Sequence, residues 1–440
     1  MNTHGSRGIF GETFDCECGR THSIRPHEVV YAPDAIDRVP DVCARCARGR
    51  RCAVVMDLRT GEAAGNRAAD ALDRAGWAVR RIIVDDPPGG GDPVCDEATK
   101  AALAEQLGEA DLIVPVGSGV ISDLGKWLSF EAAVPFVTFA TAASMNGYTS
   151  ANVAPTVGGV KTLLRARPPE AVLSAPAVLA EAPYDMTAAG LGDVLAKSTS
   201  SADWYLNHRL FGDYYCRRSV GLIAEVELAY LGRPGDLKRR EPAAVAALFD
   251  ALLLTGVAMT LAESSAPASG GEHLISHSLD MMSSLDGSPH DLHGRQVGVA
   301  TILTAELYRR AVEMESPDLR DPPGGIDGGF WGRLADAVAA GYAEKAGRLR
   351  AAKAALAHGG AWDSLREELS RMLRPPGEIR NGLVAAGAAA KAEDIRCDRG
   401  RLLAAFLHAH EMRPRFTVLD LANLLGLMPA AAREIVETWG

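Results

Sequence analysis

The 440-residue chain lacks any run of about 18 consecutive apolar residues, the length that a membrane-spanning helix needs. Its first residues, MNTHGSRGIFGETFDCECG, are too polar for the apolar core of a signal peptide. Excess basic charge is also missing, because 46 Lys and Arg stand against 56 Asp and Glu, a formal net charge of −10. Such a chain repels a polyanion on average. We therefore expect a cytoplasmic protein without a membrane span and without a nucleic-acid partner.

Short apolar runs alternate with helical patterns in the first half of the chain. They occur in RCAVVMDLRTG, WAVRRIIVDD, ADLIVPVGSG and PFVTFATA. This alternation favours parallel strands in a doubly wound α/β domain. After Pro183 the runs stop, and segments such as FTVLDLANLLGLMPAAAREIVETW read as helices. We predict a Cys-rich segment over 1–50, a nucleotide-binding α/β domain over 51–183 and an all-helical domain over 184–440.

Cysteines are concentrated near the start of the chain, with a histidine close to them. A CxC pair followed by a CxxC pair could furnish a small structural zinc site, because closely spaced thiolates can reach one tetrahedral ion. The alternative is a set of reduced cytosolic thiols without metal, since the CxC spacing is not diagnostic. The residues concerned are Cys16, Cys18, Cys43, Cys46, Cys52 and His22.

The segment GSGVISDLGK follows the third apolar run and begins a helical pattern. Gly117 and Gly119 would let backbone amides and the positive end of a helix approach a pyrophosphate. The full GxGxxG fingerprint is absent, and glycine at such turns also occurs for steric reasons alone. Asp57 ends the first run and either binds an adenosine ribose or is an ordinary solvated residue at the end of a strand.

Three histidines and an aspartate are candidates for a catalytic metal site. His273 and His277 lie one helical turn apart in GGEHLISHSLD, and His293 follows in DLHGRQVGVA. Asp193, in GLGDVLAK, is expected to start a helix. Two imidazoles and one carboxylate are a common set for a catalytic ion with an open position. Taken one at a time, each residue is also explained as a core histidine or a helix-start aspartate.

The order of several motifs resembles that of the sn-glycerol-1-phosphate dehydrogenases, especially their bacterial branch. These enzymes belong to the superfamily of 3-dehydroquinate synthase, glycerol dehydrogenase and iron-containing alcohol dehydrogenases. The likeness extends from about residue 9 to about residue 427. The motifs are CECGRTH, MDLRT, GSGVISDLGK, TAASMNGYTSA, GLGDVLAK, SGGEHLISHSLD, LHGRQVGVA and FTVLDLANLLG.

The resemblance implies a dehydroquinate synthase-like fold, with an N-terminal Rossmann-like domain, a C-terminal helical metal-binding domain, and metal and nicotinamide in the cleft. It assigns metal binding to Asp193, His273 and His293, and proton relay to His277. It assigns cofactor binding to Asp57, Gly117, Ser118, Gly119, Asp123, Thr141 and Ser144. It places Asn146, Lys161, Lys197 and His277 near the substrate, with His277, Asn146 and Lys197 taking part in catalysis.

The implied reaction is an NAD- or NADP-linked interconversion of dihydroxyacetone phosphate and sn-glycerol 1-phosphate by hydride transfer. A divalent ion would stabilise the alkoxide; zinc ranks first, and nickel and iron are alternatives. Asp57 beside the ribose would repel a 2′-phosphate, which favours NAD. The expected partner is a small-molecule substrate, a phosphorylated triol or ketone. The family also implies a homodimer or larger homo-oligomer.

Two positions depart from the family pattern. Asn146 stands where many members have Asp, so hydrogen bonding to substrate hydroxyls survives without the negative charge. Ala266 stands in the segment Ser265–Gly270 where the family has an arginine suited to bidentate phosphate binding. Lys161, Lys197 or an arginine from elsewhere would have to compensate. Otherwise the substrate is another polyol, sugar phosphate or small alcohol.

Two further alternatives remain at this point. A dehydroquinate-synthase-like lyase would use NAD only transiently and produce no net NADH. A non-catalytic binding protein would keep the fold and use its N-terminal cysteines for zinc-mediated contacts. The joint presence of Asp193, His273, His277 and His293 favours an enzyme, because a dead site has no physical need for converging ligands.

Overall fold

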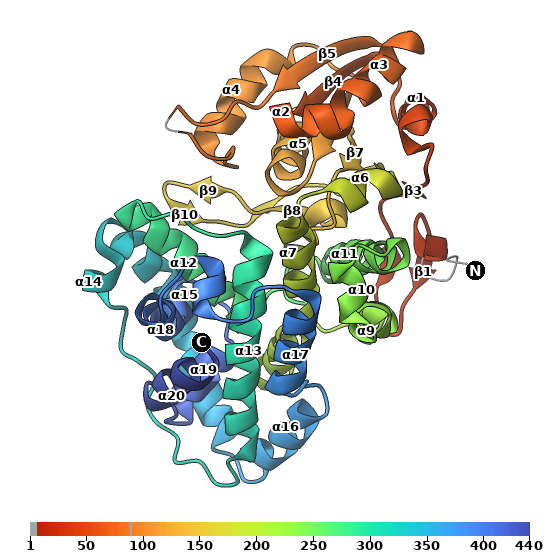
Figure 1. Ribbon diagram of the computed structural model, residues 1–440. Coiled ribbons are helices and arrows are strands. Elements are labelled where there is room, and N and C mark those ends of the chain that lie inside the picture. Colours follow the sequence, from red (N-terminus) through yellow and green to blue (C-terminus); the bar gives the residue numbers. More distant parts are fainter. Residues whose placement is uncertain (1–6, 89) are drawn as a thin grey trace. The chain divides into compact units, whose positions relative to one another are not determined.

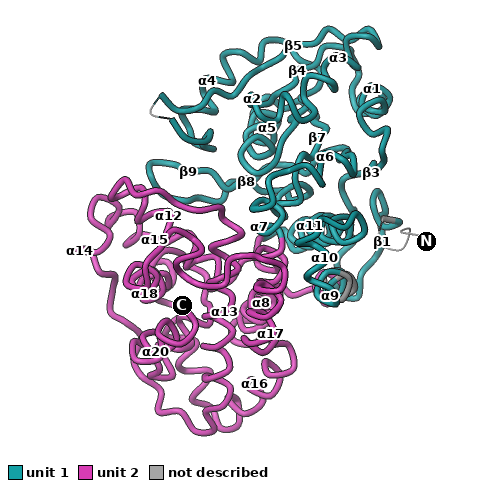
Figure 2. The backbone as a smooth tube through the Cα atoms, in the orientation of Figure 1, with its two compact units in different colours: residues 1–190, 221–264 teal, residues 191–220, 265–440 magenta. Residues whose placement is uncertain are grey.

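The computed structural model describes residues 7–88 and 90–440 and divides the chain into two compact units (Figures 1 and 2). Unit 1 comprises Met1–Gly190 and Gly221–Ser264, and unit 2 comprises Leu191–Val220 and Ser265–Gly440. The segment 221–264 thus groups with the N-terminal unit, whereas the predicted ranges include it in the helical domain.

A six-stranded parallel sheet is the centre of unit 1, in the order β3-β12-β7-β6-β4-β5 (Figure 1). Four of its strands coincide with the four predicted apolar runs. The outer strand β3 and its neighbour β12 were not predicted, because β3 begins with a charged residue and β12 continues into the apolar segment 175–180, so neither stands out as a separate strand. The strands are β3 (Glu28–Tyr31), β4 (Arg51–Met56), β5 (Ala78–Ile83), β6 (Leu112–Gly117), β7 (Val137–Ala140) and β12 (Ala171–Ser174).

Helices cover both faces of this sheet, which explains why its strands are apolar on both sides. In β4, Cys52, Val54 and Met56 pack into one core cluster with α1 and α3. Ala53 and Val55 point the other way and pack with α4 and α5. The unit is therefore a three-layer α/β structure, as predicted. These helices are α1 (Ala35–Cys46), α3 (Asn66–Arg74), α4 (Glu97–Leu107) and α5 (Gly119–Glu131).

The rest of unit 1 consists of short elements and a buried helix, α11 (Pro242–Ala262). By length and composition α11 could cross a membrane, but 72% of its apolar window is buried. It is thus a core helix of a folded unit. The short elements are η1 (Arg7–Ile9), β1 (Thr13–Asp15), β2 (Thr21–Ser23), α2 (Leu58–Thr60), the π-turn η2 (Gly61–Gly65), η3 (Gly147–Thr149), β8 (Asn152–Val153), β9 (Thr156–Val157), β10 (Val160–Lys161), β11 (Leu164–Arg165), α6 (Pro176–Glu181) and α10 (Pro234–Lys238).

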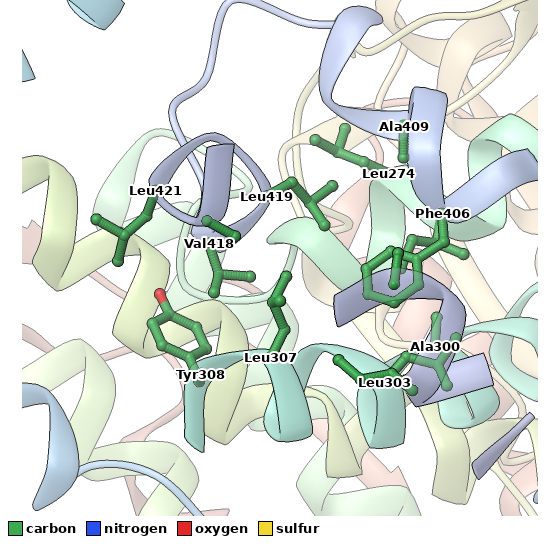
Figure 3. Close-up of a cluster of buried hydrophobic side chains, with 14 of the residues drawn as sticks. Leu274, Ala300, Leu303, Leu307, Tyr308, Phe406, Ala409, Val418, Leu419 and Leu421 are labelled. Carbon is green, nitrogen blue, oxygen red and sulfur yellow. The ribbon is translucent and has the colours of Figure 1, made fainter. Parts of the chain in front are cut away.

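The described residues of unit 2 form helices joined by loops, without a strand, as predicted for the second half of the chain. Leu303 and Leu307 of α13 pack against Val418 and Leu419 of α19 at its centre (Figure 3). Two helices, α7 (Tyr184–Leu195) and α9 (Arg217–Leu231), contribute residues to both units. The others are α8 (Lys197–Phe211), α12 (Gly271–Asp286), α13 (His293–Glu313), α14 (Gly328–Trp331), η4 (Gly332–Leu334), α15 (Ala335–Leu356), α16 (Ala361–Ser370), α17 (Pro376–Ala386), η5 (Ala392–Ile395), α18 (Arg399–His408), η6 (Ala409–Glu411), α19 (Val418–Leu424) and α20 (Ala430–Trp439).

Two local predictions were wrong. Asp193 does not start a helix; it lies in the last turn of α7, and α8 begins four residues later. The predicted helical segment 416–439 is two helices, because Gly426 at φ +74° and Pro429 interrupt it. In both cases the apolar spacing continues across the break, so periodicity alone hides the boundary.

Candidate active site

The predicted metal ligands come from three helices of unit 2. Asp193 is on α7, His273 is on α12, and His293 is the first residue of α13. Gly192 allows α7 to approach α13, because a Cβ at this position would lie 2.0 Å from the Gly294 carbonyl oxygen. Any larger residue would push the helices apart and carry Asp193 away from His293. The glycine in the GLGD motif is therefore a packing requirement of the site.

The structure brings these residues and His277 together. His273 Nε2 lies 3.5 Å from Asp193 Oδ1. The ring centroids of His273 and His293 are 5.1 Å apart, and those of His277 and His293 are 5.3 Å apart with nearly parallel planes. Asp193, His273 and His277 are 2%, 5% and 6% exposed. His293 is half-buried, and the three imidazoles and the carboxylate are the donor types that suit a divalent ion.

Glu272 determines how His273 faces its neighbours. His273 Nδ1 donates to Glu272 Oε1 at 2.8 Å, so Nε2 is the nitrogen turned toward Asp193. Burial lowers the pKa of His273, but its hydrogen bonds to Asp193 and Glu272 outweigh burial and raise it. A metal ion would bind at Nε2 while Glu272 keeps the ring oriented.

Ser276 orients His293 in the same way. The Ser276 hydroxyl donates to Gln296 Oε1 at 2.8 Å and has only one proton to give. The Nδ1–H of His293 must therefore donate to the Ser276 hydroxyl oxygen, which lies 3.0 Å from Nδ1. The lone pair of His293 is then on Nε2, the nitrogen left for a ligand. Both histidines consequently have a metal-binding tautomer set by a neighbouring side chain.

Lys197 is part of the same buried group. Its Nζ lies 3.5 Å from Asp193 Oδ1 and donates to the Ala268 carbonyl at 3.1 Å. Burial alone raises the pKa of Asp193, but the Lys197 ammonium and the His273 hydrogen bond outweigh it and hold that pKa below its usual range. Burial lowers the pKa of Lys197, and Asp193 and Glu272 offset part of this. Lys197 is thus the counter-charge of the carboxylate.

Asp203 is a buried carboxylate that sequence reasoning missed. It accepts from Tyr308 Oη at 2.6 Å and from the backbone N–H groups of Gly271 and Val418, both at 2.7 Å. Burial, with the charge of Glu272, raises the pKa of Asp203 to about 8. Asp203 fixes the start of α12, and with it Glu272 and His273. A carboxylate in the segment SSADW, within a helical stretch, was the only sequence signal for this role.

An arginine contacts the segment where the family arginine is missing. Arg415 Nη2 donates to Ser265 Oγ at 3.1 Å, and its Nη1 donates to the Ser269 carbonyl. Ala266 itself is buried. Burial lowers the pKa of Arg415, and the charges of Asp203 and Glu272 offset part of this. A guanidinium is therefore present at this segment, supplied from 150 residues further along the chain.

The predicted pyrophosphate loop of unit 1 joins β6 to α5. A Cβ on Gly117 would lie 2.5 Å from the Ile121 Cβ, so Gly117 is needed for tight packing of the turn. A Cβ on Gly119 would meet nothing within 4 Å, so there is open space beside its backbone. Ser118 precedes the 13-residue helix α5, and Thr141 N donates to the Gly117 carbonyl at 3.2 Å. The first amides of α5 could hold an anion here.

Asp57 follows β4 and caps a short helix. It accepts from Thr60 N at 2.7 Å, and Arg59 Nη2 reaches its Oδ2 at 3.1 Å. Arg59 also donates to Asp86 Oδ1 at 2.6 Å. Asp57 is 7% exposed, so the solvated strand-end interpretation does not describe it. Its carboxylate is shared between a helix cap and an ion pair.

The other predicted residues of unit 1 lie on loops after β7. The hydroxyl groups of Ser144 and Ser118 hydrogen-bond to one another, which links the two predicted cofactor loops. Asn146 is half-buried and directly precedes η3. Lys161 is half-buried in the β9–β10 hairpin, opposite Thr156.

Lys126 organises the loop that carries Asn146, a role that sequence reasoning missed. Its Nζ is fully buried and donates to Ser150 Oγ at 3.1 Å and to the Asn152 carbonyl at 3.0 Å. Asp123 lies 3.7 Å from Lys126 Nζ and accepts from the backbone N–H of Ala154 at 3.2 Å. The predicted cofactor residue Asp123 therefore supports the loop through its hydrogen bonds. Lysine at i+3 from aspartate in SDLGK was the signal available.

Residues 30–183 match the model of a family described as iron-containing alcohol dehydrogenase. The NAD(P)+ glycerol-1-phosphate dehydrogenase of Geobacillus stearothermophilus is 31% identical over 413 residues, which cover 93% of this chain and 96% of that protein. The protein of the same name from Bacillus subtilis is 28% identical, with 92% and 93% covered.

Solved structures show the same fold at low sequence identity. A probable glycerol dehydrogenase from Sinorhizobium meliloti superposes with a TM-score of 0.59 at 18% identity, covering 93% of this chain and 98% of that one. Maleylacetate reductase from Agrobacterium tumefaciens gives 0.61 at 14%, with 95% and 97% covered. The predicted fold class is confirmed. With relatives matching over nearly their whole length, the chain belongs to the glycerol-1-phosphate dehydrogenase family of metal-dependent, NAD(P)-linked dehydrogenases.

Proposed function

We propose that this chain interconverts dihydroxyacetone phosphate and sn-glycerol 1-phosphate, using NAD or NADP and one divalent ion on Asp193, His273 and His293. The observation that carries the proposal is the orientation of the two imidazoles by Glu272 and Ser276. Such hydrogen-bonded support is typical of metal-binding histidines. Zinc ranks first for two imidazoles and a carboxylate, with nickel and iron as alternatives.

The residues of unit 2 would share the work of the reaction. When bound, the ion supplies a positive charge that stabilises the developing alkoxide. His277 stacks on His293 in the same buried group and is suited to carry the hydroxyl proton, because imidazole titrates near neutrality. Lys197 would orient a substrate oxygen beside Asp193 by donating a hydrogen bond. Burial of these groups excludes bulk water and strengthens each electrostatic contact.

Unit 1 would hold the nicotinamide cofactor. The backbone of Gly119 and the first amides of α5 are suited to the pyrophosphate. Asp57 at the end of β4 is in the position where an acidic residue accepts from the adenosine ribose, which favours NAD. The cation of Arg59 beside Asp57 would weaken the repulsion between Asp57 and a 2′-phosphate. Thr141, Ser144 and Asp123 remain proposed cofactor residues.

Arg415 supports a phosphorylated substrate despite Ala266. Its guanidinium is bound to both ends of the Ser265–Ser269 segment, so the segment retains a cation. Asn146 and Lys161 remain proposed substrate residues. The alternative, the same chemistry on an unphosphorylated polyol or small alcohol, follows if Arg415 only supports the fold.

A substrate screen of the metal-reconstituted protein separates these functions. We expect dihydroxyacetone phosphate to be reduced with a higher kcat/KM than dihydroxyacetone, with net consumption of NADH or NADPH. Arg415→Lys should raise KM for the phosphorylated substrate and leave that for dihydroxyacetone unchanged, since lysine keeps the charge but loses the fork of donors. A preference for the unphosphorylated ketone would contradict the proposed substrate. Turnover without net cofactor oxidation would indicate lyase chemistry.

The homodimer or larger homo-oligomer and the cytoplasmic location remain predictions. Light scattering coupled to size-exclusion chromatography tests the first. A monomeric mass for the active enzyme would contradict it.

A further inference from the structure

A small β-hairpin near the N-terminus brings three metal-binding side chains together. Strands β1 and β2 pair antiparallel, with Asp15 opposite Thr21. The turn between them is closed by Cys16 N donating to the Arg20 carbonyl at 3.0 Å and Gly19 N donating to the Cys16 carbonyl at 2.9 Å. Gly19 has φ +83°, a conformation that favours glycine. The turn therefore places Cys16 and Cys18 at the tip of the hairpin.

The ligand atoms of Cys16, Cys18 and His22 all lie within 4.8 Å of one another. Cys18 Sγ is 3.2 Å from His22 Nε2, and His22 is 5% exposed. We propose that these three residues of the N-terminal hairpin bind a structural zinc ion, separate from the proposed catalytic ion. Thiolate and imidazole ligands closely spaced along the chain are the donor set of structural zinc sites.

The hairpin itself is small. Each strand is three residues long, and an isolated two-stranded hairpin is marginal at best in water. Its apolar contacts are a small cluster in which Ile24 packs with Val257 and Leu261 and the partly buried Phe14. A metal ion that links the turn to β2 would supply the missing constraint, because binding free energy then becomes folding free energy.

The second pair of N-terminal cysteines is not part of this group. Cys43 is buried in the core between α1 and the sheet, and burial raises its pKa well above the usual range. Burial likewise raises the pKa of Cys46 to about 11. Burial therefore disfavours the thiolate form that metal binding needs at both positions. The four-cysteine combination considered from sequence gives way to two cysteines and a histidine.

The fourth position of the ion would be filled from outside these three residues, because structural zinc ions are four-coordinate.

Cobalt(II) substitution of the full-length protein tests the site directly. The proposed catalytic ligands contain no sulfur, so a thiolate-to-cobalt charge-transfer absorption in the near ultraviolet reports only the cysteine site. We expect this absorption in the wild-type protein, together with a zinc content that exceeds one ion per chain. Cys18→Ser should remove the absorption, lose one metal ion per chain and lower the temperature of thermal unfolding. Absence of the absorption in the wild-type protein would overturn the proposal, whether or not the variants fold.

Two variants serve as controls. Cys46→Ser should keep the absorption, because Cys46 lies on α1 and not on the hairpin. Asp193→Ala should lose the other ion and keep the absorption, so failure of the proposed catalytic site and failure of this site are distinguishable. An absorption that persists in a Cys16→Ser, Cys18→Ser double variant would refute the hairpin site.

Discussion

The two units present polar groups to their proposed ligands in opposite ways. In unit 1 the candidate pyrophosphate loop relies on backbone: Gly117 makes the turn compact, and Gly119 leaves open space beside the backbone. In unit 2 the candidate metal group consists of buried side chains, among them Asp193 and His273. A backbone site tolerates many sequences, whereas a site of side chains needs particular residue types at particular places. The metal motifs were accordingly far more distinctive than the glycine loop.

The sharpest test of this comparison removes a metal ligand. Asp193→Ala should lower metal-dependent kcat/KM by at least about 10³-fold. A loss of about 4 kcal/mol of transition-state stabilisation slows the reaction by that factor. Metal content, measured by plasma emission spectroscopy, should fall together with kcat/KM. Asp185→Asn, an exposed position on the same helix, is the control and should retain both. Full metal content and activity in Asp193→Ala would refute the ligand assignment.

A smaller effect is expected from the residue that orients His273. Glu272→Gln keeps an oxygen for the Nδ1–H but removes its charge, so metal affinity should weaken by about 10- to 100-fold. Chelator competition measures this affinity, and excess metal should restore most of the activity. Glu313→Gln, an exposed position on α13, provides the comparison. An affinity unchanged from wild type would mean that Glu272 only supports the fold.

The glycines of unit 1 test the backbone side of the comparison. Gly119→Ala should raise KM for the nicotinamide cofactor several-fold and leave the free energy of unfolding within about 0.5 kcal/mol, since its Cβ has room in the absence of ligand. Gly117→Ala should instead lower the free energy of unfolding by about 1–3 kcal/mol, because its Cβ overlaps Ile121. Cofactor titrations and urea unfolding measure the two effects. If both variants affected only stability, the loop would have no part in binding.

Unit 2 also buries a titratable group outside the candidate site. Burial, with the charges of Lys345 and His408, lowers the pKa of His410 to about 3. His410 therefore stays neutral in the folded protein while the unfolded chain gains a proton below about pH 6.5. Its contribution to stability is present above that pH and is lost by about 1.4 kcal/mol per pH unit as the pH falls toward 3.

Urea unfolding between pH 7 and pH 5 measures this dependence. His410→Gln should reduce its slope by one proton, whereas the exposed His358→Gln should leave it as in the wild-type protein. An equal slope in all three proteins would show that His410 is protonated within the folded state.

Much of the fold followed from periodicity, and the exceptions have physical causes. The four predicted strands lie in the sheet, and the described residues after Pro183 are helical. Strands β3 and β12 were not predicted, because β3 begins with Glu28 and β12 continues into the apolar segment 175–180. Asp193 was placed at a helix start because aspartate favours that position, whereas its actual place in the last turn of α7 depends on the contact of Gly192 with Gly294.

The site was predictable where residue type alone carries the chemistry. Asp193, His273 and His293 were named from their donor atoms and lie together, although their metal-binding role remains a proposal. Supporting residues such as Asp203 and Lys126 were not named. A buried aspartate or lysine has no distinctive local pattern, and its role depends on which backbone groups the fold places against it.

The sequence by itself determined the family, the alternation of strands and helices, and the identity of the donor side chains, because these follow from residue type and local spacing. Tertiary structure decided which nitrogen each histidine presents, through Glu272 and Ser276. It also placed Arg415 against a segment 150 residues away and grouped Cys16 and Cys18 with His22 rather than with the cysteines of α1. These outcomes depend on side-chain hydrogen bonds and long-range packing, which local sequence patterns do not encode.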